Sequence, residues 1–481
     1  MGDENSVLTR SEARHLLRRT GFGADPRQLD HLVLRGSTRG EVVDNLLDFD
    51  PKKFKPRGKQ IEDVHNKWVK YMVRTKYQLQ EKLVLFWHDH FATGNAKVNN
   101  AELMTNQNLL FRLNCKGNFK DLVKAVNKDA AMMEYLDTVR NSKNQPNENY
   151  AREVEELFTL GVKDSAGNAN YTQADIVQIA RAFTGWDYDD DGLATFDSGR
   201  HDYANKYPAR GPKVIYTTVG QFGSGGRSFT VNGEGEPEID TVIDIIFDHR
   251  DTNSHNTVAR HIGGKLISYF AFPSPPLSLT DAVIADSGFD TSFDINSFLR
   301  ALFVRDEFYA NADDPVSVKW PVDYVVSTLN LLRMKLKSKY QYVDGGDGAA
   351  IRDQLLNMGQ VLLDPPSVFG WDWETAWISS ATLLARCSFT RDATAARAGG
   401  GTSLRPEKLI DLTLTDPGDV VDAVADRLGV NLTATERSIL INYLTDNHPN
   451  TPVDLNDPDT RDGKLHGLFG LILQSPAYQL H

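Results

Sequence analysis

Residues 146–161, PNENYAREVEELFTLG, predict a helix that carries polar groups where a plain core helix has none. On a wheel of 3.6 residues per turn, Tyr150, Val154 and Phe158 share an apolar face, and Glu153 lies at its edge. An unpaired charge at such an edge is costly to bury. We therefore expect Glu153 to be mostly buried and bonded to a cation or a metal. The alternative is a purely structural salt bridge to an arginine of a neighbouring helix.

Helix signals recur outside this segment. Thr9 and Glu12 form a predicted capping box, and Gly21 and Gly23 end the helix that follows. Further helices are expected from the caps and the apolar periodicity at about 26–36, 37–47, 61–75, 77–91 and 172–185. Residues 51–60, with two prolines and five basic residues, are typical of a linker.

The composition changes at residue 187. Residues 187–238 are rich in Gly, Asp, Thr and Tyr, and the segments 213–219 and 227–231 are typical of strands. The sequence therefore predicts a mainly α protein with a multi-helix, bundle-like architecture and a small β-rich insertion or flap. The expected regions are 1–186 (helical), 187–238 (β-rich), 239–389 (helical) and 390–481 (a mobile loop followed by helices).

The totals limit the classes of function. A chain of 481 residues is long for one core, so two or three packed regions are expected. The net charge of −12 argues against nucleic acid as the main partner. No segment approaches the roughly 20 apolar residues that span a bilayer. The two cysteines, Cys115 and Cys387, provide no disulfide framework and no CxxC metal site, although a single bridge between them stays open.

The N-terminus bears on localisation. It is polar and acidic and does not resemble a secretory signal. Either the protein stays inside the cell, or this sequence begins after a signal.

Two histidines near the end of the helix predicted at 77–91 are candidate metal ligands. His88 and His90 stand at i,i+2 and do not face each other on a helix, so they do not form an HExxH zinc pair. At a fraying helix end they can still converge on one ion. The alternative is that each ring hydrogen-bonds to a neighbouring backbone group.

His201 and Asp202 lie in the irregular region and are candidate catalytic residues. Loops on a rigid scaffold commonly carry function. Together with Glu148, Glu153 and His88, these residues supply the nitrogen and oxygen ligands that zinc, iron or manganese accept.

An aspartate run offers a second kind of metal site. Asp187, Asp189 and Asp191 match the opening of a calcium-binding loop, although the expected Glu at position 12 is Ser198. The rival interpretation, which we favour, is a β-hairpin with a tight turn at Asp191-Gly192.

Seven segments, in this order along the chain, resemble a large bacterial family called domain of unknown function 1800. They are 15–23 (HLLRRTGFG), 86–93 (FWHDHFAT), 146–161, 180–186 (ARAFTGW), 200–202 (RHD), 365–371 (PPSVFGW) and 473–479 (LQSPAYQ). The resemblance covers nearly the whole chain. It implies a mostly helical protein that is often exported, so it favours a location outside the cytoplasm. It also implies a possible partner, because these proteins are often encoded beside the sulfatase-like family called domain of unknown function 1501.

Two functional hypotheses follow. In the first, Glu148, Glu153, His201 and Asp202 surround one cleft with His88, Arg152 organises the carboxylates, and metal-assisted or acid–base chemistry attacks an extracellular polymer such as a glycan. In the second, the protein is a non-catalytic structural or assembly protein of the cell surface. The tryptophans at 371, 373 and 377 either stack on sugars or fill the core.

Overall fold

The computed structural model describes residues 3–229, 233–334, 336, 351–395 and 404–481. In these residues it contains 23 α-helices and two sheets of two strands each. The expected mainly α fold with a small β-rich insertion is confirmed. None of the described helices is long and apolar enough to cross a membrane. Cys115 and Cys387 are both free thiols.

Capping side chains fix where several helices begin. The predicted box of Thr9 and Glu12 opens α1 (Arg10–Thr20), and Thr172 with Asp175 opens α11 (Gln173–Ala182) in the same way. Asp25 caps α2 (Pro26–Leu34). The cap of α3 (Arg39–Leu47) is Thr38, one residue beyond the predicted position.

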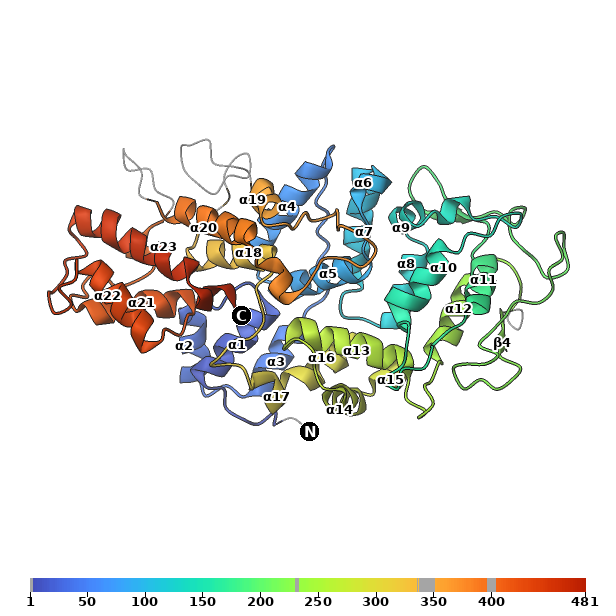
Figure 1. Cartoon of the computed structure of the whole chain (residues 1–481), viewed down its shortest axis with the longest axis horizontal. Helices are drawn as coiled ribbons and strands as arrows, with labels where there is room; N and C mark the ends of the chain where they lie inside the picture. The colour runs from blue at the N-terminus through green and yellow to red at the C-terminus, as the bar shows by residue number, and fades with distance from the viewer. Residues whose placement is uncertain (1–2, 230–232, 335, 337–350, 396–403) are drawn as a thin grey trace.

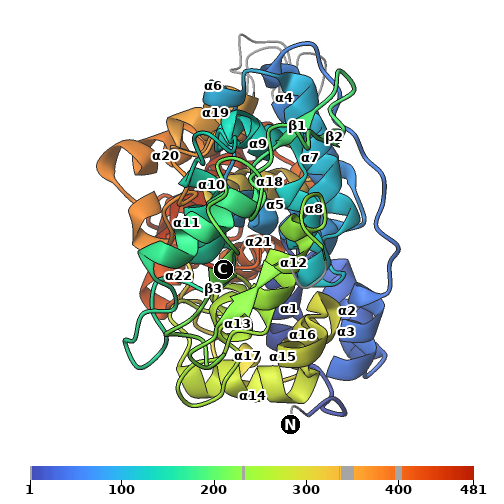
Figure 2. The ribbon, with the colours of Figure 1, turned by 90° about the vertical axis from the view of Figure 1, so that its right-hand side faces the viewer.

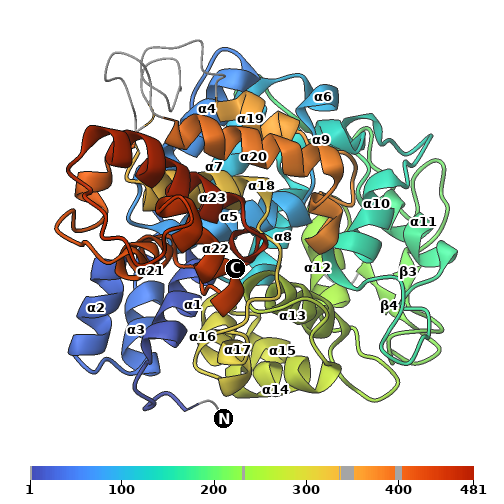
Figure 3. The same ribbon diagram turned by 60° about the vertical axis from the view of Figure 1, so that its left-hand side comes forward.

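Helix α5 (Gln78–His90) lies at the centre of the molecule, as Figures 1 and 3 show. All of its residues from Leu79 to His90 are buried, including its charged side chains. Glu81 pairs with Arg112, and Lys82 pairs with Asp323 at 2.8 Å. Since a buried charge requires a partner, these pairs allow a helix with polar residues to cross the core. The helix delivers the segment 86–93 to the middle of the protein.

The other helices of the first half surround α5. They are α4 (Ile61–Arg74), α6 (Asn95–Val98), α7 (Ala101–Leu113), α8 (Phe119–Asn127), α9 (Ala130–Tyr135) and α10 (Asn149–Glu153), which continues as the π-helix η2 (Val154–Thr159). Residues 51–60 contain no helix, as expected of a linker.

The β-rich insertion is less regular than predicted. Strand β1 (Trp186–Tyr188) pairs with β2 (Ala194–Phe196), and β3 (Val214–Ile215) pairs with β4 (Arg227–Ser228), both antiparallel. The expected strands at 213–219 and 227–231 shrink to two residues each, and 230–232 lie outside the described residues. Strand β3 ends because the next residue, Tyr216, has a φ of 57°, and three glycines between the strands also have positive φ and turn the chain away from extended geometry: Gly220, Gly223 and Gly226. Strand β3 packs against α11, as Figures 2 and 3 show, and the chain continues after the insertion into α12 (Glu238–Phe247) and α13 (Thr257–Phe270).

The second half completes the helical body. Its helices are α14 (Leu277–Ser287), α15 (Phe289–Ser292), α16 (Ile295–Phe303), α17 (Asp306–Tyr309), α18 (Pro321–Leu331), α19 (Ile351–Asn357), α20 (Ser380–Thr394), α21 (Pro417–Leu428), α22 (Ala434–Leu444) and α23 (His466–Gln474). Helix α20 packs along α23, seen in orange and red in Figure 3. It extends to Thr394, past the predicted loop start at 390, and 396–403 lie outside the described residues.

Candidate functional site

The segment 146–161 is helical from Asn149 onward, and its predicted apolar face of Tyr150, Val154 and Phe158 is buried. Glu153 is partly buried and has no hydrogen bond or ion pair within the described part of the chain, so the expected cationic partner is wrong. A metal partner stays a prediction. Glu155 occupies the core instead, 0% exposed, and its Oε1 accepts a hydrogen bond of 2.6 Å from the hydroxyl of Tyr216. Glu155 follows the buried Ala151 by four residues, so it lies on the same buried face of the helix, whereas Glu153 lies outside that face.

The other two candidates of this segment lie at the surface. Arg152 pairs with Glu148 at 3.3 Å and with Glu156 at 3.5 Å, so the arginine does join two carboxylates. Gln173 bridges Glu148 and Arg152. All these side chains are partly exposed, and such pairs contribute little to stability.

His201 and Asp202 are enclosed in the protein. Asp202 accepts two hydrogen bonds from Arg181, at 3.2 and 3.1 Å, and another from Arg210. Nδ1 of His201 lies 2.8 Å from the carbonyl of Thr184, and its Nε2 lies 3.1 Å from Glu238. Because Arg181 belongs to α11 and Glu238 to α12, this network holds the insertion against both helices.

The aspartate run forms a hairpin, so the favoured interpretation is confirmed. Its turn spans residues 189–193, longer than the predicted Asp191-Gly192. Oδ1 of Asp189 accepts the backbone N–H groups of Asp191 and Leu193, and Asp187 pairs with Arg200 at 2.8 Å. No group of three or more His, Cys, Asp or Glu side chains in the described residues is placed to hold a metal ion. Calcium here, and zinc, iron or manganese at His88 and His90, stay predictions.

His88 hydrogen-bonds to a neighbouring backbone group, as the alternative to a metal site predicted. Its Nε2 accepts the N–H of Leu363 at 2.9 Å, and its ring lies between Trp68 and Trp371. Burial lowers its pKa to about 3, so the ring is neutral. No hydrogen bond or ion pair in the described chain joins His88 to His201, and the two have separate sets of partners.

His90 contacts both the end of the π-helix and a lysine. Its Nε2 lies 3.2 Å from the carbonyl of Phe158, which can only accept, so Nε2 carries the proton. Burial lowers the pKa of His90 well below its usual value, and Nδ1 is therefore an unprotonated acceptor. Nζ of Lys265 lies 3.2 Å from this Nδ1. Burial lowers the pKa of Lys265, and the charge of Asp89 opposes that shift.

Asp89, between the two histidines, is the residue that sequence reasoning missed. Its Oδ1 accepts the N–H of Trp371 at 2.8 Å and its Oδ2 accepts Nε1 of Trp373 at 3.1 Å. Burial raises its pKa to about 7, in spite of these bonds and of Lys265. A carboxyl group of this pKa exchanges protons at neutral pH, which suits a general acid or base.

An open pocket of about 490 Å³ lies next to these residues, because Lys265 and Trp373 line its wall. The polar and aromatic residues of its wall are Arg260, His261, Lys265, Ser268, Thr280 and Trp373. His261 hydrogen-bonds to the carbonyl of Leu157, burial lowers its pKa to about 3, and its buried Nε2 has no hydrogen-bond partner in the described residues. His261 and Lys265 stand at i,i+4 on α13, a spacing that places them on one face and that the sequence displays.

The comparisons with known proteins agree with the resemblance. A family model described as "Protein of unknown function (DUF1800)" matches residues 15–480. The chain belongs to this family. No curated protein and no solved structure matches it. Three of the segments that carry the DUF1800 resemblance contact one another behind the pocket residue Lys265. His90 of 86–93 contacts Lys265 and Phe158 of 146–161, and Asp89 bonds to Trp371 of 365–371.

Proposed function

We propose that this DUF1800 protein is an acid–base enzyme whose reaction takes place in the pocket around Lys265. One observation carries the proposal. An amine whose pKa is lowered by burial lines an open pocket, contacts an unprotonated histidine nitrogen and is coupled to a carboxyl group whose pKa is about 7. Ionisable groups shifted in this way cluster at active sites.

The residues divide the work as follows. In its neutral form, which burial favours, Lys265 takes a proton from the bound substrate. The ammonium so formed donates a hydrogen bond to Nδ1 of His90, whose tautomer is fixed by the Phe158 carbonyl. Ionised Asp89 offsets the new positive charge, because its Coulomb interaction raises the pKa of Lys265. Asp89 is itself held by Trp371 and Trp373 and does not line the pocket, so we regard it as a positioning residue.

The pocket wall suggests the kind of substrate. Ser268, Thr280 and Arg260 offer hydrogen bonds, and Trp373 offers an aromatic ring beside them. Trp371 and Trp377 are buried and belong to the core, so Trp373 is the member of the tryptophan group that is available for stacking. This combination fits a sugar unit of an extracellular polymer.

The test is the reactivity of Lys265 at different pH values, followed by an activity screen. Amine-selective labelling with mass-spectrometric readout should modify Lys265 at a lower pH than Lys128, whose side chain forms a partly exposed ion pair with Asp240. Wild type should release reducing ends from at least one polysaccharide of a broad panel, and Lys265→Met should not, whereas Lys128→Met should match wild type. Ordinary labelling of Lys265 would overturn the proposal.

A second candidate is a non-catalytic assembly protein. The observation in its favour is that many buried charges are already fully paired, as in Arg112–Glu81 and Arg181–Asp202. If Lys265→Met leaves polymer turnover unchanged while a cellular phenotype of deleting the protein is fully complemented, the assembly role is preferred.

A further inference from the structure

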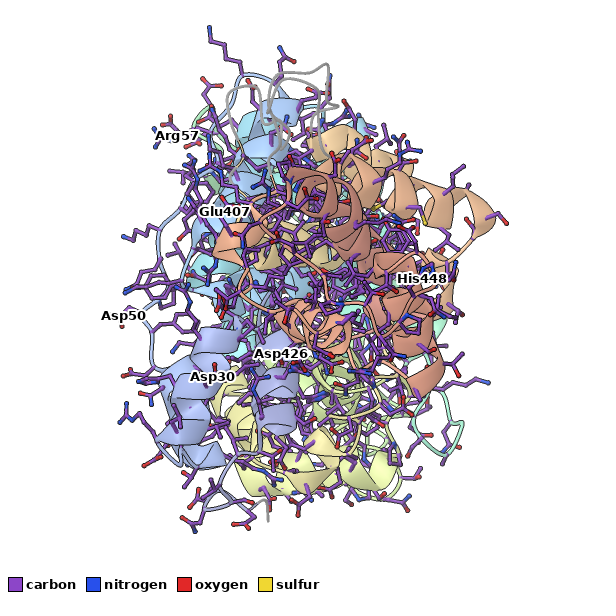
Figure 4. The ribbon with its side chains drawn as sticks, turned by 90° about the vertical axis from the view of Figure 1, so that its left-hand side faces the viewer. Asp30, Asp50, Arg57, Glu407, Asp426 and His448 are labelled. Carbon is purple, nitrogen blue, oxygen red and sulfur yellow. The ribbon has the colours of Figure 1, made fainter. Side chains whose placement is uncertain are left out.

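Positive charge is concentrated in one short segment of this acidic protein. Residues 51–76 contain nine Lys or Arg and two Asp or Glu, a net charge of +7, whereas the remaining chain carries −19. This segment comprises the linker at 51–60 and helix α4. Arg57 lies near the upper left edge of the molecule in Figure 4, whereas Asp30 and Asp426 lie in its lower half. A local basic surface on an acidic body indicates a dedicated anionic partner.

The basic residues line a groove. A cavity of about 450 Å³ lies between the linker, α4 and the start of α7. The charged residues of its wall are four cations and two carboxylates: Lys55, Arg57, Lys59, Lys67, Asp63 and Glu102. We define these six residues as the basic groove. Nζ of Lys67 donates a hydrogen bond to the carbonyl of Arg57.

The linker is held in place, so the groove is formed in advance. Phe54 stacks on Tyr71 with ring centroids 3.9 Å apart, and the guanidinium of Arg112 lies over both rings. Pro56 is buried, and the bond from Lys67 ties the linker to α4. A preformed site loses less conformational entropy on binding than a flexible one.

The cations of the groove lack carboxylate partners. Within the described chain, the side chains of Lys55, Arg57 and Lys59 form no ion pair, although Arg57 and Lys59 are exposed. Elsewhere on the surface, arginines such as Arg300 and Arg437 pair with nearby aspartates. Unpaired cations along a groove leave their charge available to a ligand.

We propose that the basic groove binds an acidic polysaccharide, a chain that carries carboxylate or sulfate groups together with free hydroxyls. The four cations match the anionic groups. Asp63 and Glu102 match the hydroxyls, because a carboxylate can only accept hydrogen bonds and a sugar hydroxyl donates them. A polyphosphate offers no such donors, and both carboxylates would repel it.

Two other polyanions fit the groove less well. Single-stranded nucleic acid binds strongly where bases stack on aromatic rings, and the groove has no aromatic side chain in its wall. The nearby Phe54 and Tyr71 stack on each other. A flat anionic membrane would engage a protruding surface better than a concave one. The binding of a polysaccharide here does not depend on the reaction proposed at Lys265.

The experiment measures binding alone, at several salt concentrations, by fluorescence anisotropy of labelled polygalacturonate and labelled heparin. Wild type should bind at least one of them, with an affinity that falls as salt rises. The double variant Arg57→Glu, Lys59→Glu should bind at least about 10-fold more weakly, a factor that corresponds to about 1.4 kcal/mol. The control Arg35→Glu, Lys163→Glu changes the net charge equally at exposed sites outside the groove and should bind as wild type does.

Further binding measurements decide which class of polyanion the groove prefers. Glu102→Gln should lower the preference for polygalacturonate over polyphosphate, because it removes an acceptor for sugar hydroxyls and a charge that repels phosphate. Equal losses in the groove and control variants would overturn the proposal. So would tighter binding to oligo(dT) or to phosphatidylserine vesicles than to either polysaccharide. Turnover at Lys265 is not needed for any of these results, so failure here leaves the proposed reaction untouched.

Discussion

Replacing Asp89 with Asn should change how the stability of the protein depends on pH. In the folded protein burial raises the pKa of Asp89 to about 7. An unfolded aspartate has a pKa of about 3.9, so the difference is about 3 units, or about 4 kcal/mol at 1.36 kcal/mol per unit. Because the folded pKa is the higher one, this stabilisation is fully present below about pH 4 and is lost as the pH rises through 7.

The measurement is the free energy of unfolding by urea at pH values from 5 to 8. Between pH 4 and 7, Asp89 should make the unfolding free energy of wild type fall by about 1.4 kcal/mol per pH unit. Asp89→Asn removes this contribution, so its curve should be flatter by that amount. The amide also cannot accept from both Trp371 and Trp373, which should cost about 1–3 kcal/mol at every pH. An unchanged slope would refute the assignment of a raised pKa to Asp89.

Asp129 provides a matched control. Burial raises its pKa to about 7 as well, and its carboxylate accepts from Gln107 and from the N–H of Met132. Asp129→Asn should flatten the pH dependence of stability equally. Only Asp89→Asn should lower the pKa of Lys265 further, because only Asp89 supplies that lysine with a compensating charge. Labelling of Lys265 should therefore shift to lower pH in the first variant alone, and equal shifts in both would contradict the coupling.

Two further predictions concern the buried polar groups. Tyr216→Phe removes the hydroxyl that donates to the fully buried Glu155 and should lower the unfolding free energy by about 1–3 kcal/mol, measured by urea denaturation. A loss below about 0.5 kcal/mol would contradict the assigned bond. Arg181→Met leaves the buried Asp202 short of its main partner and should cost about 3–5 kcal/mol. Arg437→Met, which breaks an exposed pair, should cost less than about 1 kcal/mol by the same assay, and similar losses in the two variants would refute the role of burial.

Much of the helical fold can be predicted from local chemistry. The capping boxes of α1 and α11 follow from side chains within a few residues of each helix start. The approximate bounds of α4 and α5, whose starts have no side-chain cap, follow from apolar periodicity. Strand lengths in the insertion were overestimated, because alternation predicts extended chain but not the partner that pairs with it. The positive φ values of Gly220 and Gly223 are incompatible with a paired strand at these positions. The sequence alone does not show which φ a glycine adopts.

The candidate site was predicted less well than the fold, for two physical reasons. The buried face of this helix is wider than its apolar residues indicate, because it includes Glu155 beside Ala151 and Thr159, so the sequence does not show that Glu155 rather than Glu153 is buried. Lys265 and Asp89 are 176 positions apart along the chain, and only tertiary packing couples their charges. A His next to an Asp in a loop predicts a catalytic site at His201 and Asp202. The same pattern also occurs in a buried network of ion pairs, which the structure shows here.

The end of the π-helix η2 explains why two histidine rings each keep one unprotonated nitrogen. The last carbonyls of any helix lack helical N–H partners. At the end of η2 these carbonyls belong to Leu157 and Phe158, and the rings of His261 and His90 hydrogen-bond to them. Each bond fixes a proton on the ring nitrogen that faces the helix. The opposite nitrogens, Nε2 of His261 and Nδ1 of His90, are then left without a proton, and one of them meets Lys265. A helix end that needs hydrogen-bond donors thus leaves two histidine nitrogens as acceptors, and the one on His90 can accept a hydrogen bond from Lys265.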